Sequence, residues 1–224
     1  MSAPDPVVFL LDVDNTLLDN DRFAADLTAW LDHAFGKVER ERYWSIYARL
    51  RNQLGYADYL GALQRYRVRN PRDFRILAVS DFLINYPFAN RLYPNSLDVV
   101  AACGNFGALA IVSDGDVVFQ PLKVHRSGLH EAFGGNVLIY IHKEQELDDI
   151  AARYPADHYV FVDDKVRILT AVKKIWGERV TTVFPRQGHY ALDQREVAKY
   201  PAPDVMIERI GAMLELDLAR LART

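Results

Sequence analysis

The sequence predicts an α/β fold, a Rossmann-like parallel sheet with helices on both faces plus an inserted helical cap domain. Short apolar runs of the length of buried strands alternate with segments of helical periodicity, a pattern typical of a parallel sheet covered on both faces. A long stretch without a convincing strand follows the first run. The chain has 224 residues, enough for one large domain with an insertion.

Five apolar runs are expected to form buried strands. They are Val7–Leu11, Ala108–Val112, Val137–Ile141, Tyr159–Val162 and Val180–Phe184. Helical periodicity separates the later runs and predicts one helix from Glu144 to Arg153 and another from Val166 to Trp176. Gly177 stands where the second of these helices is expected to end.

The long stretch after the first run is expected to form several helices. Its apolar residues recur at helical spacing, beginning with Phe23, Leu27 and Leu31. The stretch is too long for an ordinary connection between two strands. We therefore expect a helical cap domain over residues 20–90 and a core domain made of residues 1–19 and 91–224. The alternative is that these helices are extra core helices of a single domain.

Composition excludes several classes of protein. The formal net charge is −3, so there is no basic surface of the kind that binds nucleic acid. Cys103 is the only cysteine, which excludes an internal disulfide and fits a reducing compartment. No apolar stretch has the length of a membrane span, and the N-terminus lacks the basic start of a signal peptide. We expect a cytoplasmic monomer or homodimer with no nucleic-acid or membrane partner.

Two carboxylates end the first apolar run. Asp12 and Asp14 are followed at once by Asn15 and Thr16. Strand residues two apart face the same way, so both carboxylates can reach one site past the strand end. Carboxylates that close repel each other unless a cation or a shared proton offsets them, and Mg²⁺ is the first candidate. A plain turn is the alternative, because Asp and Asn are common turn residues.

Similar side chains follow the later runs. Ser113 and Asp114 come after the second run, Lys143 comes after the third, and the fourth ends in Asp163 and Asp164. Ligands of open α/β sheets bind at the carboxyl ends of the strands, so these groups are expected to converge. They suit phosphoryl transfer. A metal and a lysine would neutralise phosphate oxygens, one aspartate would attack phosphorus, and another would exchange a proton with the leaving oxygen.

In these motifs the sequence resembles the haloacid dehalogenase superfamily over essentially the whole chain. The family's four motifs are D-x-D-x-T, a Ser or Thr closing the second strand, a Lys, and an acidic pair after a later strand. They are matched in family order by Asp12, Asp14 and Thr16, then Ser113, then Lys143, then Asp163 and Asp164. Helices inserted just after the first motif resemble the first cap type of this family.

The resemblance implies roles for the matched carboxylates. Asp12 would be the nucleophile and a metal ligand. Asp14 would be the general acid/base and would bind the metal through its backbone carbonyl. Asp164 would be the direct Mg²⁺ ligand, with Asp163 beside it as the alternative. The catalytic set would be completed by Ser113 and Lys143.

The resemblance also implies a set of substrate-binding residues. They are Asn15, Thr16, Ser113, Asp114 and Lys143. Asp114 departs from the commoner pattern, in which Asn follows the second motif. Lys123 is the alternative to Lys143 as the catalytic lysine. We favour Lys143 because it follows the third strand, and we expect Lys123 to be a helix-surface residue or a packing stem.

The activity implied is that of a Mg²⁺-dependent phosphatase that hydrolyses a small phosphorylated metabolite through an aspartyl-phosphate intermediate. A sugar-phosphate mutase has the same catalytic set and stays open. A dehalogenase of the same superfamily is less favoured, because those enzymes lack the second Asp that Asp14 matches. A non-catalytic binding protein that retains the fold is expected to have lost motif residues that are present here.

Two further segments have alternative interpretations. The segment from Tyr43 to Arg72 is rich in Tyr and Arg, which could hold an anionic, partly planar ligand such as a nucleotide or a phosphorylated sugar. We favour the simpler interpretation of a helical surface with Tyr packed inward and Arg outward. After the fifth run, His189 is expected to be a surface histidine rather than a catalytic base.

Overall fold

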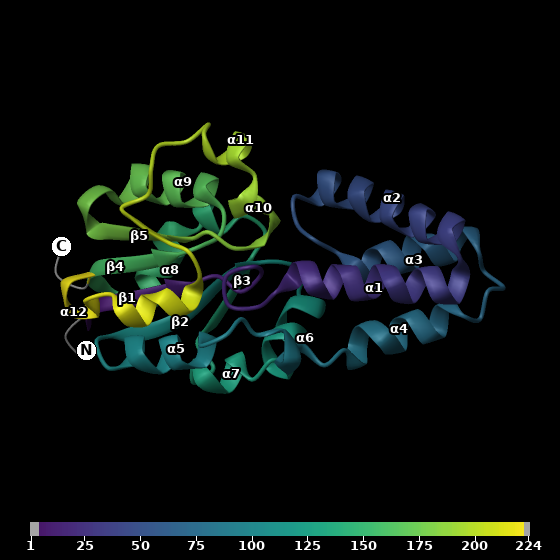
Figure 1. Cartoon of the computed structure of the whole chain (residues 1–224), viewed down its shortest axis with the longest axis horizontal. Coiled ribbons are helices and arrows are strands. Elements are labelled where there is room, and N and C mark those ends of the chain that lie inside the picture. The colour runs from purple at the N-terminus through teal and green to yellow at the C-terminus, as the bar shows by residue number, and fades with distance from the viewer. Residues whose placement is uncertain (1–4, 222–224) are drawn as a thin grey trace.

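The computed structural model describes residues 5–221 and confirms the predicted fold class (Figure 1). In these residues a parallel sheet has the strand order β3-β2-β1-β4-β5-β6. The strands are β1 (Asp5–Leu11), β2 (Ala108–Asp114), β3 (Val137–Tyr140), β4 (Ala156–Val162), β5 (Val180–Pro185) and β6 (Val205–Ile207). Every pairing of neighbouring strands is parallel.

All five predicted strands are present, with shifted ends. β2 continues to Asp114, so the predicted site residue Ser113 lies inside the strand rather than after it. β3 stops at Tyr140, one residue before the predicted end. The strand β6 was not predicted, because its apolar run has only three residues, of which only Ile207 is buried. A strand this short at the sheet edge leaves no period-2 pattern to detect.

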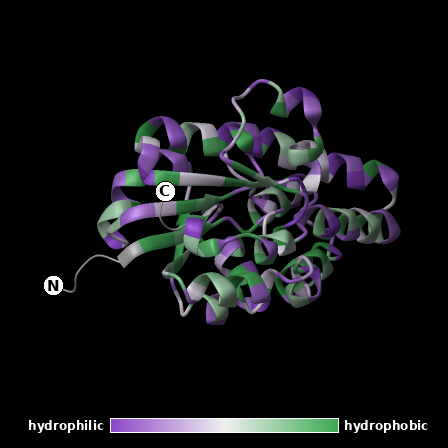
Figure 2. Ribbon diagram, turned by 60° about the vertical axis from the view of Figure 1, so that its left-hand side comes forward, coloured by the Kyte–Doolittle hydropathy of each residue, from purple (hydrophilic) through white to green (hydrophobic). Residues whose placement is uncertain are grey.

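Alternate residues of β1 pack on opposite faces of the sheet. Phe9 and Leu11 belong to the cluster that contains α5 (Ser96–Gly104), α6 (Phe119–Arg126) and α7 (Leu129–Ala132). Val8 and Leu10 belong to the cluster that contains α8 (Leu147–Arg153) and α9 (Val166–Trp176). Figure 2 shows hydrophobic residues along the strands between these two layers of helices. The central strand is therefore buried on both faces, as its continuous apolar run predicts.

Of the two helices predicted after the third strand, one is confirmed and the other is wrong in its first turn. α9 spans Val166–Trp176 as predicted, and Gly177 follows it with φ of 55°, a conformation that favours glycine. The helix predicted from Glu144 is wrong in its first turn. Lys143–Gln145 form a 3₁₀ turn, and α8 begins only at Leu147. This short turn brings Lys143 back toward the sheet.

Four helices lie between β1 and η1 and form the inserted helical cap of the fold. They are α1 (Asn20–Phe35), α2 (Lys37–Leu54), α3 (Tyr59–Arg69) and α4 (Ile76–Asn85), followed by the 3₁₀ turn η1 (Phe88–Arg91). Figure 1 shows them together on the right, beyond the end of the sheet. The division at residues 20 and 90 stays a prediction.

The remaining elements lie in the C-terminal part of the chain. They are η3 (Gly177–Arg179), α10 (Gly188–Leu192), α11 (Gln194–Val197), η4 (Ile210–Glu215) and α12 (Leu218–Leu221). Within residues 5–221, no helix combines the length and the apolar character that crossing a membrane requires.

Aromatic packing joins the cap helices to the core. Phe23 of α1 is fully buried, and its ring lies 5.1 Å from that of Tyr59, 4.9 Å from that of Tyr86 and 5.2 Å from that of Phe88. Phe119 of α6 completes the contact at 5.7 Å. Ring pairs at these separations are favourable beyond the area they bury. Phe23 therefore ties α1 to α3, η1 and α6 at once.

Loss of the Phe23 ring should destabilise the protein strongly. We expect Phe23→Ala to lower the free energy of unfolding by about 3–5 kcal/mol, because truncation leaves a cavity among four rings. Guanidinium unfolding measures this change. Phe74→Ala is the control, because Phe74 is 82% exposed and should change stability by less than about 0.5 kcal/mol. Equal losses in the two variants would contradict the assignment of Phe23 to the junction.

Candidate active site

A tight turn after β1 sets the positions of the first motif. The carbonyl of Val13 accepts hydrogen bonds from the backbone N–H groups of Thr16 at 3.2 Å, Leu17 at 2.9 Å and Leu18 at 2.9 Å. Asn15 has φ of 61°, the left-handed conformation that Asn tolerates better than most residues. Upstream of the turn, the N–H of Asp12 donates to the carbonyl of Val162 in β4. The turn therefore starts from a fixed point on the sheet.

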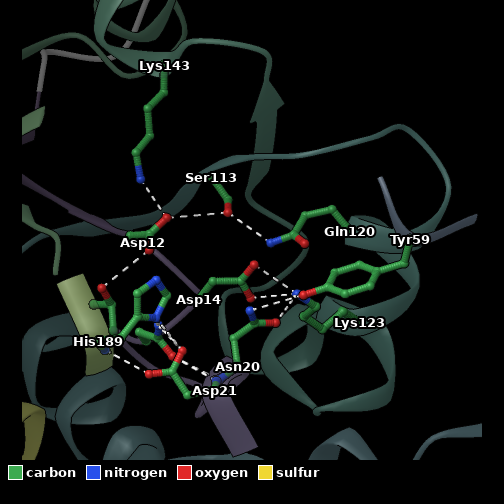
Figure 3. Close-up of polar contacts among 12 residues, drawn as sticks. Asp12, Asp14, Asn20, Asp21, Tyr59, Ser113, Gln120, Lys123, Lys143 and His189 are labelled. Atoms are coloured by element: carbon green, nitrogen blue, oxygen red, sulfur yellow. Dashed lines mark hydrogen bonds and ion pairs between the residues drawn. The ribbon is translucent and has the colours of Figure 1, made fainter. Parts of the chain in front are cut away.

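Asp12 is held from several sides (Figure 3). Its side chain is 2% exposed, and Lys143 Nζ lies 2.5 Å from Oδ1. The hydroxyl of Ser113 lies 3.4 Å from the same oxygen, and the hydroxyl of Thr16 lies 3.3 Å from Oδ2. Burial alone would raise the pKa of Asp12, but the ammonium groups of Lys143 and Lys165 hold that pKa below its usual value. Asp12 is thus a buried carboxylate that stays ionised.

Lys143 bridges two carboxylates. Its Nζ lies 2.6 Å from Asp163 Oδ2 as well as 2.5 Å from Asp12 Oδ1, and it donates to the carbonyl of Val112 at 3.0 Å. Burial alone would lower the pKa of Lys143, but Asp12, Asp163 and Asp114 together raise it. Asp114 Oδ1 also accepts a hydrogen bond from the backbone N–H of Lys143 at 2.8 Å. The structure therefore brings Lys143 next to Asp12, and its role as the catalytic lysine stays a prediction.

Three carboxylates at this point form a candidate metal centre. Asp12, Asp163 and Asp164 each offer an oxygen within 4.8 Å of the others, and all three are buried. Among the described residues, neither carboxylate oxygen of Asp164 has a hydrogen-bond partner. Burial raises the pKa of Asp163 to about 6 and that of Asp164 well above its usual value. The unpartnered oxygens of Asp164 suit a hard divalent cation, and they favour Asp164 as the direct ligand over Asp163, which is paired with Lys143.

Lys123 is the main correction to the sequence analysis. It is 1% exposed, and its Nζ lies 2.6 and 2.8 Å from the two carboxylate oxygens of Asp14 and 2.9 Å from Asn20 Oδ1. The rings of Phe23 and Phe119 lie about 6 Å away, at distances typical of cation–π contacts. The expectation of a helix-surface residue or a packing stem is wrong, because α6 turns this face toward the first motif.

Crystal structures of known proteins now place the chain in a family. A haloacid dehalogenase-like hydrolase from Burkholderia xenovorans LB400 is 58% identical, with a TM-score of 0.91 over 96% of this chain and 97% of that chain. The chain belongs to the haloacid dehalogenase-like hydrolases. No family model matches the sequence. No curated protein matches it either.

More distant structures share the fold of this haloacid dehalogenase-like hydrolase. The L-2-haloacid dehalogenase from Xanthobacter autotrophicus is 17% identical, with a TM-score of 0.61 over 93% of this chain and 97% of that chain. The hydrolase YfnB from Bacillus subtilis, described as bound to magnesium, is 13% identical, with a TM-score of 0.62 over 93% of this chain and 96% of that chain. At these identities the likeness concerns the fold alone.

Two glutamines outside the predicted set hold the site of this hydrolase. Gln120 Nε2 donates to the hydroxyl oxygen of Ser113 at 3.0 Å, which leaves the hydroxyl hydrogen free to point at Asp12 (Figure 3). Gln187 is buried and donates to the carbonyls of Asn15 at 3.1 Å and Thr16 at 2.7 Å. Gln120 lies only seven residues from Ser113, whereas the contacts of Gln187 are recognised only in three dimensions, because its partners are distant in sequence.

The side chains of Asn15 and Thr16 form hydrogen bonds that hold the turn after β1. Asn15 Oδ1 accepts from the backbone N–H groups of Asn20 and Asp21, so this side chain caps the start of α1. The hydroxyl of Thr16 accepts from the N–H of Asp164 at 3.0 Å while it donates to Asp12. The substrate contacts predicted for Asn15, Thr16, Ser113, Asp114 and Lys143 stay predictions.

A cavity of about 360 Å³ lies between the cap helices and the core, and Asp14 and Asp114 belong to its lining. From the Tyr- and Arg-rich segment, Tyr43 and Tyr66 pack inward as expected. Tyr47, however, lines the cavity together with Arg51 and Tyr56. His189 also lines it and contacts Asp21 at 2.5 Å while staying largely exposed. The interpretation of this segment as a plain helical surface is therefore only partly right.

Removal of the Lys143 ammonium group should destabilise the metal-free protein. We expect Lys143→Met to lower the free energy of unfolding of the metal-free protein by about 3–5 kcal/mol, because Asp12 and Asp163 would stay buried without their ammonium partner. Guanidinium unfolding in the presence of a chelator measures it. Lys199→Met, which breaks the exposed ion pair with Glu196, should change little. A small loss in both variants would show that Lys143 is not the charge that holds these carboxylates.

The raised pKa of Asp164 predicts a pH dependence in the metal-free protein. A carboxyl group whose folded-state pKa is raised stabilises the fold at low pH and loses that contribution as pH rises through the raised pKa. Asp164→Asn removes this loss. The melting temperature of the variant minus that of the wild type should therefore increase as pH rises above the ordinary carboxyl pKa of 3.8.

Thermal melts with a chelator present test this sign. Asp98→Asn, a substitution on the exposed face of α5, should show a constant difference over the same range. A difference for Asp164→Asn that stays flat or shrinks with rising pH would mean that Asp164 is already compensated in the folded protein.

Proposed function

We propose that this hydrolase is a Mg²⁺-dependent phosphatase that acts on a small phosphate monoester through an aspartyl-phosphate intermediate. One observation carries the proposal: the two aspartates of the first motif have separate lysine partners. Asp12 is paired with Lys143 among buried carboxylates, and Asp14 is paired with Lys123 at the cavity wall. Two carboxylates in different environments are suited to two different roles.

Asp12 has the environment of a nucleophile. Lys143 and Lys165 keep it ionised, and burial leaves it without a hydration shell to remove before attack. Its oxygen would form a bond to phosphorus while the bond from phosphorus to the ester oxygen breaks. The product is an acyl phosphate on Asp12 and the free alcohol, as carboxylate nucleophiles give in other enzymes.

Asp14 has the position of the general acid/base. Its side chain is 19% exposed and belongs to the cavity lining, where the leaving group would lie. In its protonated form it would give the proton to the leaving oxygen. Once ionised, it pairs with Lys123 as the structure shows, and this form would take a proton from the water that hydrolyses the acyl phosphate.

Ser113 and Lys143 would bind the transferring phosphoryl group. Both contact Asp12 Oδ1, so a phosphoryl group on Asp12 would bring its oxygens to the same hydroxyl and ammonium donors. The ammonium would offset the charge on those oxygens as it develops. Gln120 keeps the hydroxyl of Ser113 directed toward this point.

The carboxylates fit a magnesium ion. Asp12 and Asp164 would hold it with the backbone carbonyl of Asp14, and Asp163 would stay paired with Lys143. The ion would supply positive charge to the phosphoryl oxygens. The cofactor, the metal ligands and the catalytic roles are parts of this proposal.

Hydrolysis of a panel of phosphate monoesters tests the proposal. The wild type should release phosphate with Mg²⁺ and not with a chelator. Asp12→Asn should lower kcat by about a thousandfold or more, because it loses the nucleophile. Asp14→Asn should lower kcat by about 10²–10⁴-fold, because it loses the general acid/base. Asp98→Asn, an exposed substitution of the same kind, should keep activity. Mass spectrometry of acid-quenched samples should find the phosphoryl group on Asp12.

The same panel includes a 2-haloacid, because a dehalogenase is among the structures that share this fold. Halide release without phosphate release would contradict the proposal. Retention of phosphate release in Asp14→Asn would remove the general acid/base role. Transfer of the phosphoryl group to a second hydroxyl of the substrate, without net release of phosphate, would indicate a mutase.

A further inference from the structure

The cavity beside Asp14 has walls that are unusually rich in aromatic rings. Its volume of about 360 Å³ is at the small end of the range for small-molecule sites. The rings of Trp44, Tyr47, Tyr56, Tyr59 and Tyr190 contribute to the lining. We infer that the leaving group of the substrate contains a planar aromatic ring, which this cavity binds by stacking. The inference rests on the proposed function.

The cap supplies an ordered aromatic wall. Tyr47 of α2 and Tyr59 of α3 have ring centroids 4.8 Å apart with planes inclined by 31°, and Trp44 meets Tyr47 edge-on at 5.2 Å. Hydrogen bonds fix this wall: the hydroxyl of Tyr43 donates to the carbonyl of Tyr59 at 3.0 Å. Figure 3 shows the hydroxyl end of Tyr59 directed toward Asp14 and Lys123. The rings are therefore in place before a ligand binds.

The core supplies a further ring of the cavity lining. Tyr190 of α10 has the guanidinium of Arg51 and the ammonium of Lys165 each 5.4 Å from its ring centroid. Arg51 belongs to α2 of the cap and Lys165 precedes α9 of the core, so Tyr190 is contacted from both parts. These contacts hold the ring at the cavity, with the cap wall and Asp14 belonging to the same lining.

The exposure of these rings favours a ligand that stacks. Trp44, Tyr47 and Tyr190 are each only partly buried, so they keep apolar surface that a ligand would cover. A planar ring gains both this burial and the additional energy of aromatic pairs. A saturated ring of similar size gains only the burial. We therefore expect the cavity to distinguish the two by about tenfold in affinity.

A matched pair of esters tests the inference. Benzyl phosphate and cyclohexylmethyl phosphate carry the same charge on a similar skeleton, and only the first has a planar ring. Calorimetry with the Asp12→Asn variant and Mg²⁺ measures their binding without turnover. We expect benzyl phosphate to bind about tenfold more tightly. The ratio should fall toward one when Tyr47→Leu is added and should persist with Tyr47→Phe, which keeps the ring. Tyr154→Leu, outside the cavity lining, should leave the ratio unchanged.

The outcomes separate this inference from the proposed function. Equal affinity for the two esters, or no binding of either at millimolar concentration, overturns the inference. Wild-type hydrolysis of both esters with equal kcat/KM also overturns it and leaves the phosphatase proposal in place. Tenfold tighter binding of benzyl phosphate without hydrolysis of any ester supports recognition of the ring and contradicts the phosphatase proposal.

Discussion

The ammonium group of Lys143, between Asp12 and Asp163, is the interaction on which the rest of the site depends. A buried charge is tolerated only when partners surround it, and here each charge is the partner of another. The topology makes this possible. In the order β3-β2-β1-β4, Lys143 reaches from the end of β3 past the carbonyl of Val112 in β2 to Asp12 after β1, and Asp163 meets it from β4. Parallel strands thereby bring four distant segments to one point.

The charges at this point do not balance. Asp12, Asp163 and Asp164 are buried carboxylates, and the ammonium groups of Lys143 and Lys165 act to lower the pKa of each. The pKa of Asp12 is lowered while the pKa values of Asp163 and Asp164 are raised. The fold therefore keeps the proposed nucleophile Asp12 ionised, and it leaves the carboxylate oxygens of Asp164, the other proposed carboxylate ligand, without a hydrogen-bond partner among the described residues. A magnesium ion would supply the missing positive charge. The protein would therefore be less stable without the metal, and its site would be ready to bind it.

Sequence reasoning reached the motif residues because each follows an apolar run that a buried strand requires, and the parallel sheet then brings their ends together. It failed for Lys123, although the sequence holds a signal: Phe119 lies one helical turn before it and Val124 directly follows it. A lysine on that face is buried only if a carboxylate meets it, and Asp14 is far away in sequence. The cavity could not be predicted from the sequence for a related reason. Its walls include residues of α2, α3 and α10, whose relative positions depend on packing of the whole chain.

The pairing of Asp14 with Lys123 links the proposed chemistry to the attachment of the cap. The Lys123 ammonium lies among the rings of Phe23, Phe88 and Phe119, and Phe23 belongs to α1, the first helix of the cap. Asn20, at the start of α1, accepts a hydrogen bond from the same ammonium. A movement of α1 would therefore alter the surroundings of Lys123 and, through it, the position of Asp14. Because the cap is inserted directly after the first motif, α1 contributes both to the cavity lining and to the surroundings of the proposed general acid/base.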